Sequence, residues 1–316
     1  MNAGERKTEI YGRTWSAAIT LKNGDKQSTI VTSAPQRIVF DIKYTPYSDI
    51  GFAEFKFYGF DQNTNNAIIE NGSIIEFSAG YVESAERLFY GQIMNVYHQR
   101  SGVDAYIRVF ARSMTKDSLA ATTNKTWGPG TSYLDIITDA VKSMDGTIVL
   151  VPEDKEDWVN KLGKTETSGY SFSGYSIELV NDLAHRFGFK IYPFSASNNR
   201  KSSGVLSQFY MCQPGTFSNA RRHVISADTG MEGSPIYTTN GVVVSSRLNS
   251  AVHPCDKIIV HSAYYAASAG DPYGANQRTY ASNKISEYYA ESITHRGDLE
   301  TNLWTTTIVG RYKNDE

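Results

Sequence analysis

The most constraining feature of the sequence is a strict alternation of apolar and polar residues between Gln36 and Tyr44. The apolar positions share one face: Ile38, Phe40, Ile42 and Tyr44. Asp41 and Lys43 fall on the opposite face. Because successive side chains of a β-strand point to opposite faces, this period of two predicts a strand with one side against a core.

Similar strand patterns recur through the first third of the chain. The other candidates are Tyr11–Leu21, Phe52–Phe60, Ser73–Tyr81, Leu88–Gln99 and Asp104–Arg112. Turn signals separate some of them, at Asn23-Gly24-Asp25, Asn71-Gly72 and Ser101-Gly102. Six strands with short connections indicate a sandwich or barrel, which we place at residues 1–114.

The pattern changes near Thr115, where helical spacing begins. Ser132 is a candidate N-cap for a helix over Tyr133–Met144, and Gly188 ends a second helix over Ser176–Phe187. Short strands are expected at Thr147–Val151 and Phe189–Phe194, with loops at the remaining segments: Asn124–Thr131, Glu153–Asp157 and Ser195–Gly204. Residues 115–225 therefore predict a small α/β domain.

The last third, residues 226–316, again has strand patterns. The candidates are Gly241–Leu248, Lys257–His261, Ser286–Thr294 and Leu303–Gly310. Ser262–Ala281 has no period and is expected to be a long insertion. The predicted fold class is thus β-rich α+β, with two antiparallel β regions flanking the α/β domain.

The two β regions share a short motif order. Ile74-Ile75 and Ser78-Ala79 recur as Ile258-Ile259 and Ser262-Ala263. Later, His98 with Gly102 is echoed by His295 with Gly297. Such self-similarity indicates either a duplicated unit or a chance match.

Bulk properties narrow the function classes. Charged residues make up 20% of the chain, and its formal net charge is −2. Without a basic excess, we expect no extensive neutralisation of nucleic acid. Met1–Glu9 lacks the apolar region of a signal peptide, and no apolar run is long enough to span a bilayer. We therefore expect folding in a cytoplasm and no stable membrane insertion.

Candidate chemical groups favour structural roles. Cys212 and Cys255 are expected to be separate buried thiols, with pairing across domains as the alternative. Three histidines lack the spacing of a metal site: His223, His253 and His261. Three carboxylates suggest a solvated loop rather than a catalytic pair: Asp154, Glu156 and Asp157. We therefore assign no catalytic, metal or cofactor-binding residue and expect no enzyme.

Two further features concern turns and interfaces. Arg296-Gly297-Asp298 is interpreted as a hairpin turn rather than a receptor motif, with His295 as a hydrogen-bonded strand-end residue. Five tyrosines are candidate interface residues, because tyrosine is enriched at interfaces: Tyr264, Tyr265, Tyr273, Tyr288 and Tyr289. For Tyr288 and Tyr289, core packing within a strand is an equal alternative.

The order of several motifs resembles a known family. Gly233-Ser234-Pro235 precedes Leu248-Asn249, and His295–Asp298 precedes Asn302 and Trp304. This order is similar to the C-terminal barrel of baseplate hub proteins from contractile-tailed phages, whose relatives include the type VI secretion spike protein. Leu88–Ile93 resembles the first barrel of that family, and Ser176–Tyr192 resembles its intervening domain.

The resemblance implies a structural protein of the virion, assembled in the host cytoplasm. The expected fold has two tail-tube-like β-barrels, and a homotrimer would adapt the three-fold central spike to the six-fold tail tube or tube initiator. Baseplate wedge proteins are further expected partners, and DNA would pass through a neutral or acidic lumen without specific binding. The alternatives are a cell-wall hydrolase of the tail and a receptor- or carbohydrate-binding tail-tip module.

Overall fold

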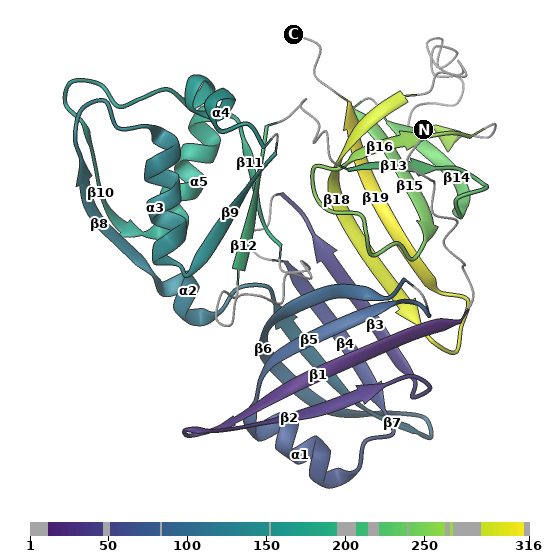
Figure 1. Ribbon diagram of the computed structural model, residues 1–316. Helices are drawn as coiled ribbons and strands as arrows, with labels where there is room; N and C mark the ends of the chain where they lie inside the picture. The colour runs from purple at the N-terminus through teal and green to yellow at the C-terminus, as the bar shows by residue number, and fades with distance from the viewer. Residues whose placement is uncertain are drawn as a thin grey trace.

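The computed structural model describes residues 12–46, 51–82, 84–151, 153–194, 207–213, 221–238, 240–262, 266–267 and 286–312. We divide them into a first β-unit (residues 12–112), a middle unit (113–213) and a last β-unit (221–312). Figure 1 shows the first β-unit below, with the middle unit at upper left and the last β-unit at upper right.

The bounds of the elements are as follows. The first β-unit holds β1 (Arg13–Asn23), β2 (Lys26–Ser33), β3 (Ile38–Tyr44), β4 (Phe52–Tyr58), α1 (Gln62–Asn71), β5 (Gly72–Tyr81), β6 (Glu86–Ser101) and β7 (Asp104–Arg112). The middle unit holds α2 (Lys116–Ala120), β8 (Thr122–Trp127), α3 (Tyr133–Ser143), β9 (Gly146–Val151), α4 (Lys155–Leu162), β10 (Tyr170–Tyr175), α5 (Ser176–Phe187), β11 (Lys190–Pro193) and β12 (Ser207–Cys212). The last β-unit holds β13 (Arg222–Ile225), β14 (Met231–Thr238), β15 (Gly241–Arg247), β16 (Lys257–Val260), β17 (Ala266–Ala267), β18 (Ser286–Asp298) and β19 (Trp304–Tyr312).

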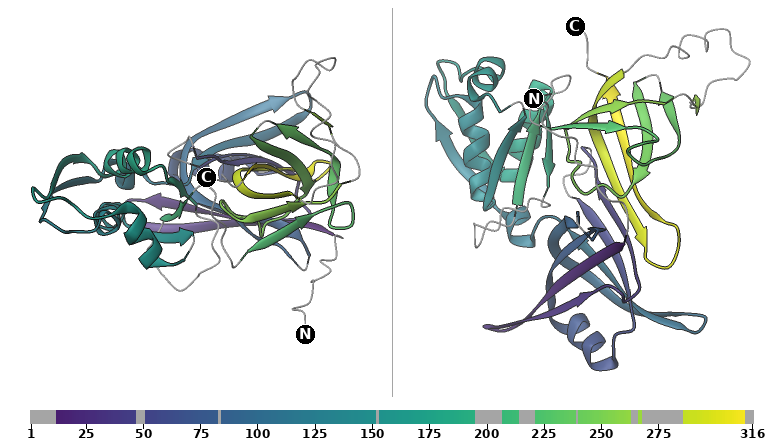
Figure 2. Two further views of the ribbon diagram at one scale, coloured as in Figure 1. Left: turned by 90° about the horizontal axis from the view of Figure 1, so that it is seen from above. Right: turned by 45° about the vertical axis from the view of Figure 1, so that its right-hand side comes forward.

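The two β-units form one 14-stranded sheet, joined where β18 pairs with β3. Strand order in the first β-unit is β3-β4-β7-β6-β5-β1-β2, and in the last it is β14-β15-β19-β18-β16-β13. Each part curls around its own core (Figure 2). The described path is open at β2 and at β17, so the β-rich prediction is confirmed, whereas closure into two barrels is not seen among these residues.

The alternating segment that opened the sequence argument is β3. Its four alternating residues Ile38, Phe40, Ile42 and Tyr44 are buried, and Phe40 and Phe77 lie with ring centroids 4.9 Å apart inside the curl. Two neighbouring elements were not predicted. β2 pairs back on β1. The expected turn at Asn71-Gly72 is instead the end of helix α1, which Asp61 caps by accepting a hydrogen bond from the Thr64 backbone N–H.

The middle unit has three layers. Helices α3 and α5 pack between the β8–β10 ribbon and the β9–β11–β12 sheet (Figure 1). The predicted caps are present, since Ser132 accepts from the Leu134 N–H and Gly188 ends α5 at a φ of 70°. Two predicted loops are structured: Asn124–Thr131 contributes to β8, and Glu153–Asp157 leads into α4. In the described part of the chain, no helix is long and apolar enough to cross a membrane.

Candidate functional site: the junction of the three units

Strand β18 is shared between the units. Its first residues pair with β16, from Ser286 opposite Val260 to Tyr289 opposite Lys257. Its last residues pair with β3, from Ile293 opposite Tyr44 to Asp298 opposite Val39. The β18–β19 register shifts between Ala290 and Ser292, which marks a β-bulge at Glu291. A bulge bends and twists a strand, so β18 can turn from one unit to the other.

Glu291 links this bulge to the middle unit. Its carboxylate is 3% exposed and forms salt bridges with Lys190 of β11 and with Arg311 of β19, the latter at 2.5 Å. A buried carboxylate is tolerated when cations and hydrogen bonds compensate for its lost hydration. Strand β18 is therefore in contact with all three units.

Phe194, just after β11, is the aromatic centre of the junction. Its ring centroid lies 4.6 Å from that of Tyr44 in the first β-unit and 4.8 Å from that of His253 in the last. Tyr210 of β12 completes the group at 5.3 Å. Burial raises the pKa of the Tyr210 phenol, against an opposing effect of Arg221. One hydrophobic cluster thus extends from the first β-unit into both others.

The preferred prediction of two separate thiols is wrong, and the alternative of pairing across domains is what the structure has. Cys212 at the end of β12 and Cys255 in the loop before β16 form a disulfide, with their Cα atoms 6.2 Å apart. Both are buried, as expected. They are separated by 43 positions and come from different units, so only the packing of β12 against the last β-unit brings them together.

The same interface groups two of the three candidate histidines around one carboxylate. His223 Nε2 lies 2.9 Å from Asp256 Oδ2, and the His253 backbone N–H donates to that oxygen at 2.8 Å. Burial raises the pKa of Asp256, although His223 opposes the shift. His261 is exposed at the end of β16. Among the described residues, no group of histidine, cysteine and carboxylate side chains can hold a metal ion.

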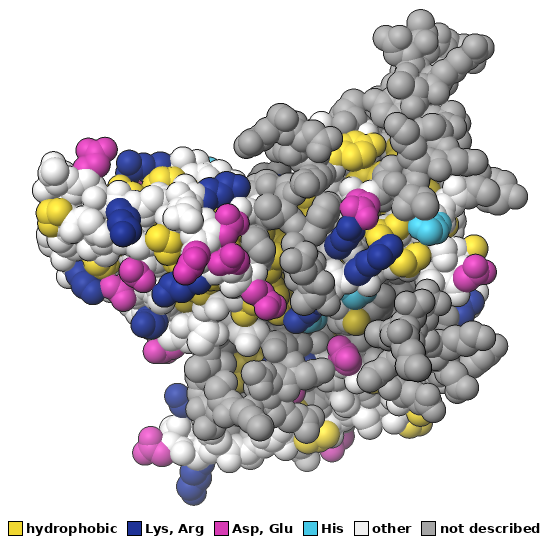
Figure 3. Space-filling model, turned by 45° about the horizontal axis from the view of Figure 1, so that its top comes forward, with side chains coloured by type: hydrophobic (Ala, Val, Ile, Leu, Met, Phe, Trp, Pro, Cys, Tyr) yellow, Lys and Arg dark blue, Asp and Glu magenta, His cyan; other side chains and the backbone are white. Residues whose placement is uncertain are grey.

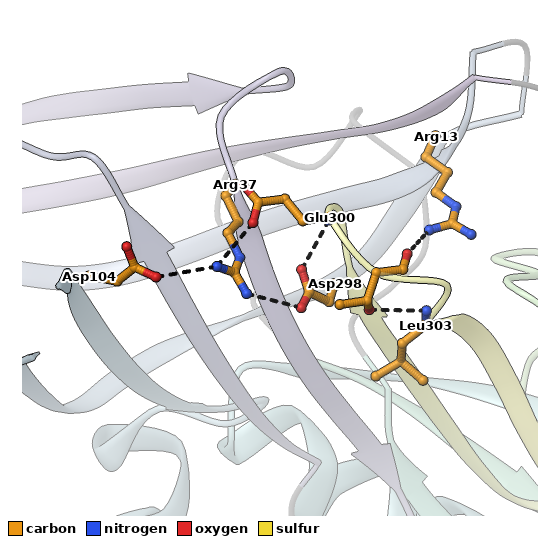
Figure 4. A network of polar contacts seen from close by, with 7 residues as sticks. Arg13, Arg37, Asp104, Asp298, Glu300 and Leu303 are labelled. Carbon is orange, nitrogen blue, oxygen red and sulfur yellow. Dashed lines mark hydrogen bonds and ion pairs between the residues drawn. The ribbon is translucent and has the colours of Figure 1, made fainter. Parts of the chain in front are cut away.

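We call the pairing of β18 with β3 the seam between the two β-units. A polar network lies at the end of this seam near Asp298 (Figure 4). The Arg37 guanidinium lies 3.3 Å from Asp298, 3.0 Å from Glu300 and 3.7 Å from Asp104. It also stacks 4.5 Å from the centre of the Tyr58 ring. Burial acts to lower the pKa of Arg37, but the hydrogen bond and charge of Asp298 outweigh it, so the pKa is raised. Through Asp298 and Glu300, the network joins the last β-unit to the first.

The tripeptide Arg296-Gly297-Asp298 is not a turn. It lies within β18, and the turn follows at residues 299–303, where Arg13 donates to the Thr301 carbonyl. Glycine is required at position 297 because a Cβ there would lie 2.4 Å from the Phe40 ring. Asp298 accepts a hydrogen bond from the Glu300 backbone N–H at 3.1 Å.

His295 is a hydrogen-bonded strand residue, as predicted. Its Nδ1 lies 2.9 Å from Thr306 Oγ1, and burial lowers its pKa to about 3. A neutral, enclosed imidazole in this setting supports packing rather than acid–base chemistry. The His-x-Gly-Asp motif is therefore a packing motif of the seam.

The remaining candidates divide as follows. Tyr288 and Tyr289 are buried within the last β-unit, in keeping with the core-packing alternative, whereas Tyr264, Tyr265 and Tyr273 lie outside the described residues. Asp154 caps α4 by accepting from the backbone N–H groups of Glu156 and Asp157. The three carboxylates therefore begin a helix instead of forming a loop.

A cavity of about 370 Å³ lies where β1, β5, β14, β15 and the β18–β19 turn meet. It is lined by Gly12, Arg13, Tyr81, Glu232, Arg247, Asn302 and Trp304. Arg13 and Arg247 line the cavity together with the oppositely charged Glu232. None of the lining side chains is a nucleophile paired with a base. On the face shown in Figure 3, acidic and basic side chains are likewise interspersed over the middle unit rather than separated by sign.

Comparisons with known proteins bear on this architecture. No protein-family model and no curated protein sequence matches the chain. Among solved structures, a tail protein from Neisseria meningitidis is similar with a TM-score of 0.54 at 8% identity, covering 96% of this chain and 97% of that one. A prophage tail protein from Shewanella oneidensis has a TM-score of 0.55 at 11% identity, covering 94% and 99%. The chain has a phage tail protein fold.

A third similar structure is an Escherichia coli component of the type VI secretion system, described as resembling the T4 bacteriophage tail proteins gp27 and gp5. Its TM-score is 0.51 at 11% identity, and the match covers 89% of this chain and 74% of that one. These similarities span nearly the whole chain, so they include both β-units and the middle unit together. They confirm the tail-like fold that the motif order predicted.

Proposed function

We propose that this chain is a non-enzymatic hub of a phage baseplate, whose trimer joins a three-fold central spike to a six-fold tail tube. The observation that carries the proposal is the repetition of one strand order in the two β-units. A trimer would contain six similar β-units, which match the six-fold tube, while its own three-fold symmetry matches the spike. A chain with a single β-unit could not match both symmetries in this way.

The seam between the units supports the same role. An adaptor must keep its two units at a fixed separation and angle, and here they share a sheet through β18 and are tied by Arg37. We propose that each β-unit acts as one tube-like barrel. The proposed domains are residues 1–114 for the first barrel, 115–225 for the α/β domain and 226–316 for the second barrel. The similarity of this chain to a phage tail protein and to a type VI secretion component is consistent with this arrangement.

The proposed partners follow from that position. They are two further copies of the chain, a central spike protein, the tail tube or its initiator, and baseplate wedge proteins, all within the virion. DNA would pass the lumen without specific binding, in keeping with a chain of net charge −2. Tyr264, Tyr265 and Tyr273 remain proposed interface residues.

The test is co-expression of the chain with the spike protein of its phage, followed by native mass spectrometry and negative-stain electron microscopy. We expect a complex with three copies of this chain and a ring about as wide as a tail tube. A stable monomer in the presence of the spike would contradict the hub. Cell-wall cleavage by that monomer would favour the hydrolase alternative, and glycan binding would favour the tail-tip module.

A further inference from the structure

We propose that Cys212 and Cys255 form a redox-operated clamp, which is open as two thiols during folding and closes afterwards to fix the middle unit to the last β-unit. The clamp would stay open in a reducing cytoplasm, where structural disulfides are rare. It would close once the protein meets an oxidising environment. The proposal rests on the proposed function only for where this happens, namely outside the host cell.

The pairing is unambiguous in this chain. There are two cysteines in all 316 residues, so an intramolecular disulfide can only join Cys212 to Cys255. One belongs to β12 of the middle unit and the other to the loop between β15 and β16 of the last β-unit. The bond is therefore a covalent link between two units that otherwise meet through side-chain contacts.

Backbone hydrogen bonds hold both cysteines in place independently of their sulfur atoms. Cys212 lies opposite Lys190 of β11 and Val151 of β9 in the middle sheet. The Cys255 backbone N–H donates to the Ala290 carbonyl of β18 at 2.8 Å. Because the resulting Cα separation of 6.2 Å lies within the disulfide range, the reduced thiols would already face each other.

Non-covalent contacts around the cysteines align the two units before oxidation. Lys190, opposite Cys212, forms the salt bridge with Glu291, next to Ala290. Two positions before Cys255, the His253 ring lies against the rings of Phe194 and Tyr210. The interface is thus assembled from charge and ring contacts, and the disulfide makes an existing arrangement permanent.

The chemistry is a two-electron thiol–disulfide exchange. One cysteine thiolate attacks a sulfur of glutathione disulfide, forming a mixed disulfide and releasing one glutathione thiolate, which takes up a proton. The second cysteine thiolate attacks the protein sulfur of that mixed disulfide and displaces the second glutathione. The two cysteines are oxidised, and one glutathione disulfide is reduced to two glutathione molecules.

Burial makes the closed clamp durable. Cys212 is 3% exposed and Cys255 is 1% exposed, so glutathione disulfide reaches the reduced thiols, and an external thiol reaches the bond, only when the interface opens locally. Exchange is therefore slow in both directions. Closing the 43-residue separation also restricts the unfolded chain. We expect the oxidised protein to unfold about 5 °C above the reduced protein.

The experiment compares the two states in the full chain. Cells that express the protein in a reducing cytoplasm are lysed directly into acid, the protein is alkylated with N-ethylmaleimide under denaturing conditions, and its intact mass is measured. We expect two maleimide adducts per chain. After the purified, folded protein is treated with glutathione disulfide, we expect no adducts, no retained glutathione and the higher unfolding temperature.

The matched control is the double variant Cys212→Ser with Cys255→Ser, whose unfolding temperature should not respond to glutathione disulfide. If that variant does not fold, the comparison of reduced and oxidised wild-type protein still decides the matter. A disulfide already present in quenched cytoplasm, glutathione retained on separate cysteines, or equal unfolding temperatures would each overturn the clamp. These readouts need no spike or trimer, so their failure would leave the hub proposal standing, and failure of the hub would not alter them.

Discussion

The two β-units have the same strand order but different interiors. β3-β4-β7-β6-β5-β1 in the first corresponds to β14-β15-β19-β18-β16-β13 in the last, and the first four pairings of each series are antiparallel. The fifth differs, because β1 pairs antiparallel with β5 whereas β13 pairs parallel with β16. The shared order supports duplication over a chance match, and the fifth pairing is where the two units differ.

The cores show how one topology accommodates different side chains. The core of the first β-unit combines aliphatic side chains with a group of large aromatic ones: Trp15, Phe40, Phe55, Phe57, Phe77 and Phe89. The last is filled mainly by aliphatic ones: Ile225, Val242, Val244, Val252, Ile258, Val260, Ile293 and Ile308. The same strand order is therefore compatible with core side chains of different size, provided that the apolar faces and the total core volume fit.

The largest expected effect tests whether the two cores unfold together. Phe55→Ala should destabilise the protein by about 3–5 kcal/mol and Ile308→Ala by about 2–5 kcal/mol, since each leaves a cavity in a fully buried site. Because β18 joins the units in one sheet, both variants should lower the midpoint of a single urea transition measured by circular dichroism. Two separate transitions, only one of which moves, would show that the units are independent.

The second prediction concerns His295, whose counterpart in the repeated motif of the first β-unit is His98. His295 is buried with a pKa of about 3, so between that value and its unfolded pKa near 6.5 the unfolded chain binds one more proton. Its contribution to stability is complete above pH 6.5 and declines by about 1.4 kcal/mol per pH unit below it, or about 2 kcal/mol at pH 5. Urea unfolding at pH 7 and pH 5 measures this loss.

Variants at the two equivalent positions sharpen the comparison. His295→Asn should reduce the pH dependence, because the asparagine does not titrate. His98→Asn, on the exposed surface of β6, is the control for replacing a histidine by asparagine. Equal slopes for wild type and His295→Asn would exclude His295 as the source.

The third prediction tests the seam. Asp298→Asn should cost about 1 kcal/mol, because it removes the ion pair with Arg37 at an 11%-exposed carboxylate while retaining an oxygen for the Glu300 N–H. Asp104→Asn is the matched control. Its side chain is 56% exposed and 3.7 Å from Arg37, so its effect should be smaller. A larger effect of Asp104→Asn would contradict the assigned geometry.

The smallest expected effect contrasts cross-strand pairs on the outer faces. Arg108 donates two hydrogen bonds to Glu54 between β4 and β7, and in the last β-unit Ser245 and Thr307 are joined by one hydroxyl bond at 3.0 Å between β15 and β19. The hydrogen bond from Arg108 lowers the pKa of Glu54. Glu54→Gln and Ser245→Ala should each cost about 0.5 kcal/mol.

Salt distinguishes the two pairs. The effect of Glu54→Gln should shrink in 1 M sodium chloride, because an ion pair at the surface is screened. The effect of Ser245→Ala should not change. Denaturant unfolding at low and high salt checks both, and a salt-insensitive Glu54 variant would contradict an ionic contribution.

Periodicity predicted much of the fold because it is a local property. The alternation in β3, the caps of α3 and α5, and most strands of both β-units could be recognised without tertiary information. Elements were missed where the local signal is weak. Helix α1 contains four asparagines, which are poor helix formers, and β8 and β10 are short polar strands that the helices α3 and α5 stabilise.

The junction could be predicted only in part. The motif at His295–Asp298 was recognisable, but its location within β18 follows from pairing with β3, which lies about 250 positions earlier in the chain. The Phe194 ring cluster had no sequence signal, because its members come from three units and share no spacing. The interface tyrosines Tyr288 and Tyr289 were ambiguous for the same reason, since a strand pattern does not say which of its faces another element covers.

The sequence by itself determined the strand and helix types, their approximate order and the tail-like motif series, because period, caps and turns act over a few residues. Tertiary structure alone decided that the two β-units share one open sheet, that Glu291 is compensated by cations from two units, and that Cys212 meets Cys255. Each of these depends on the free energy of packing between distant segments. The alternation in β3 shows both sides, since it fixed which face is buried but not that its edge would pair with β18.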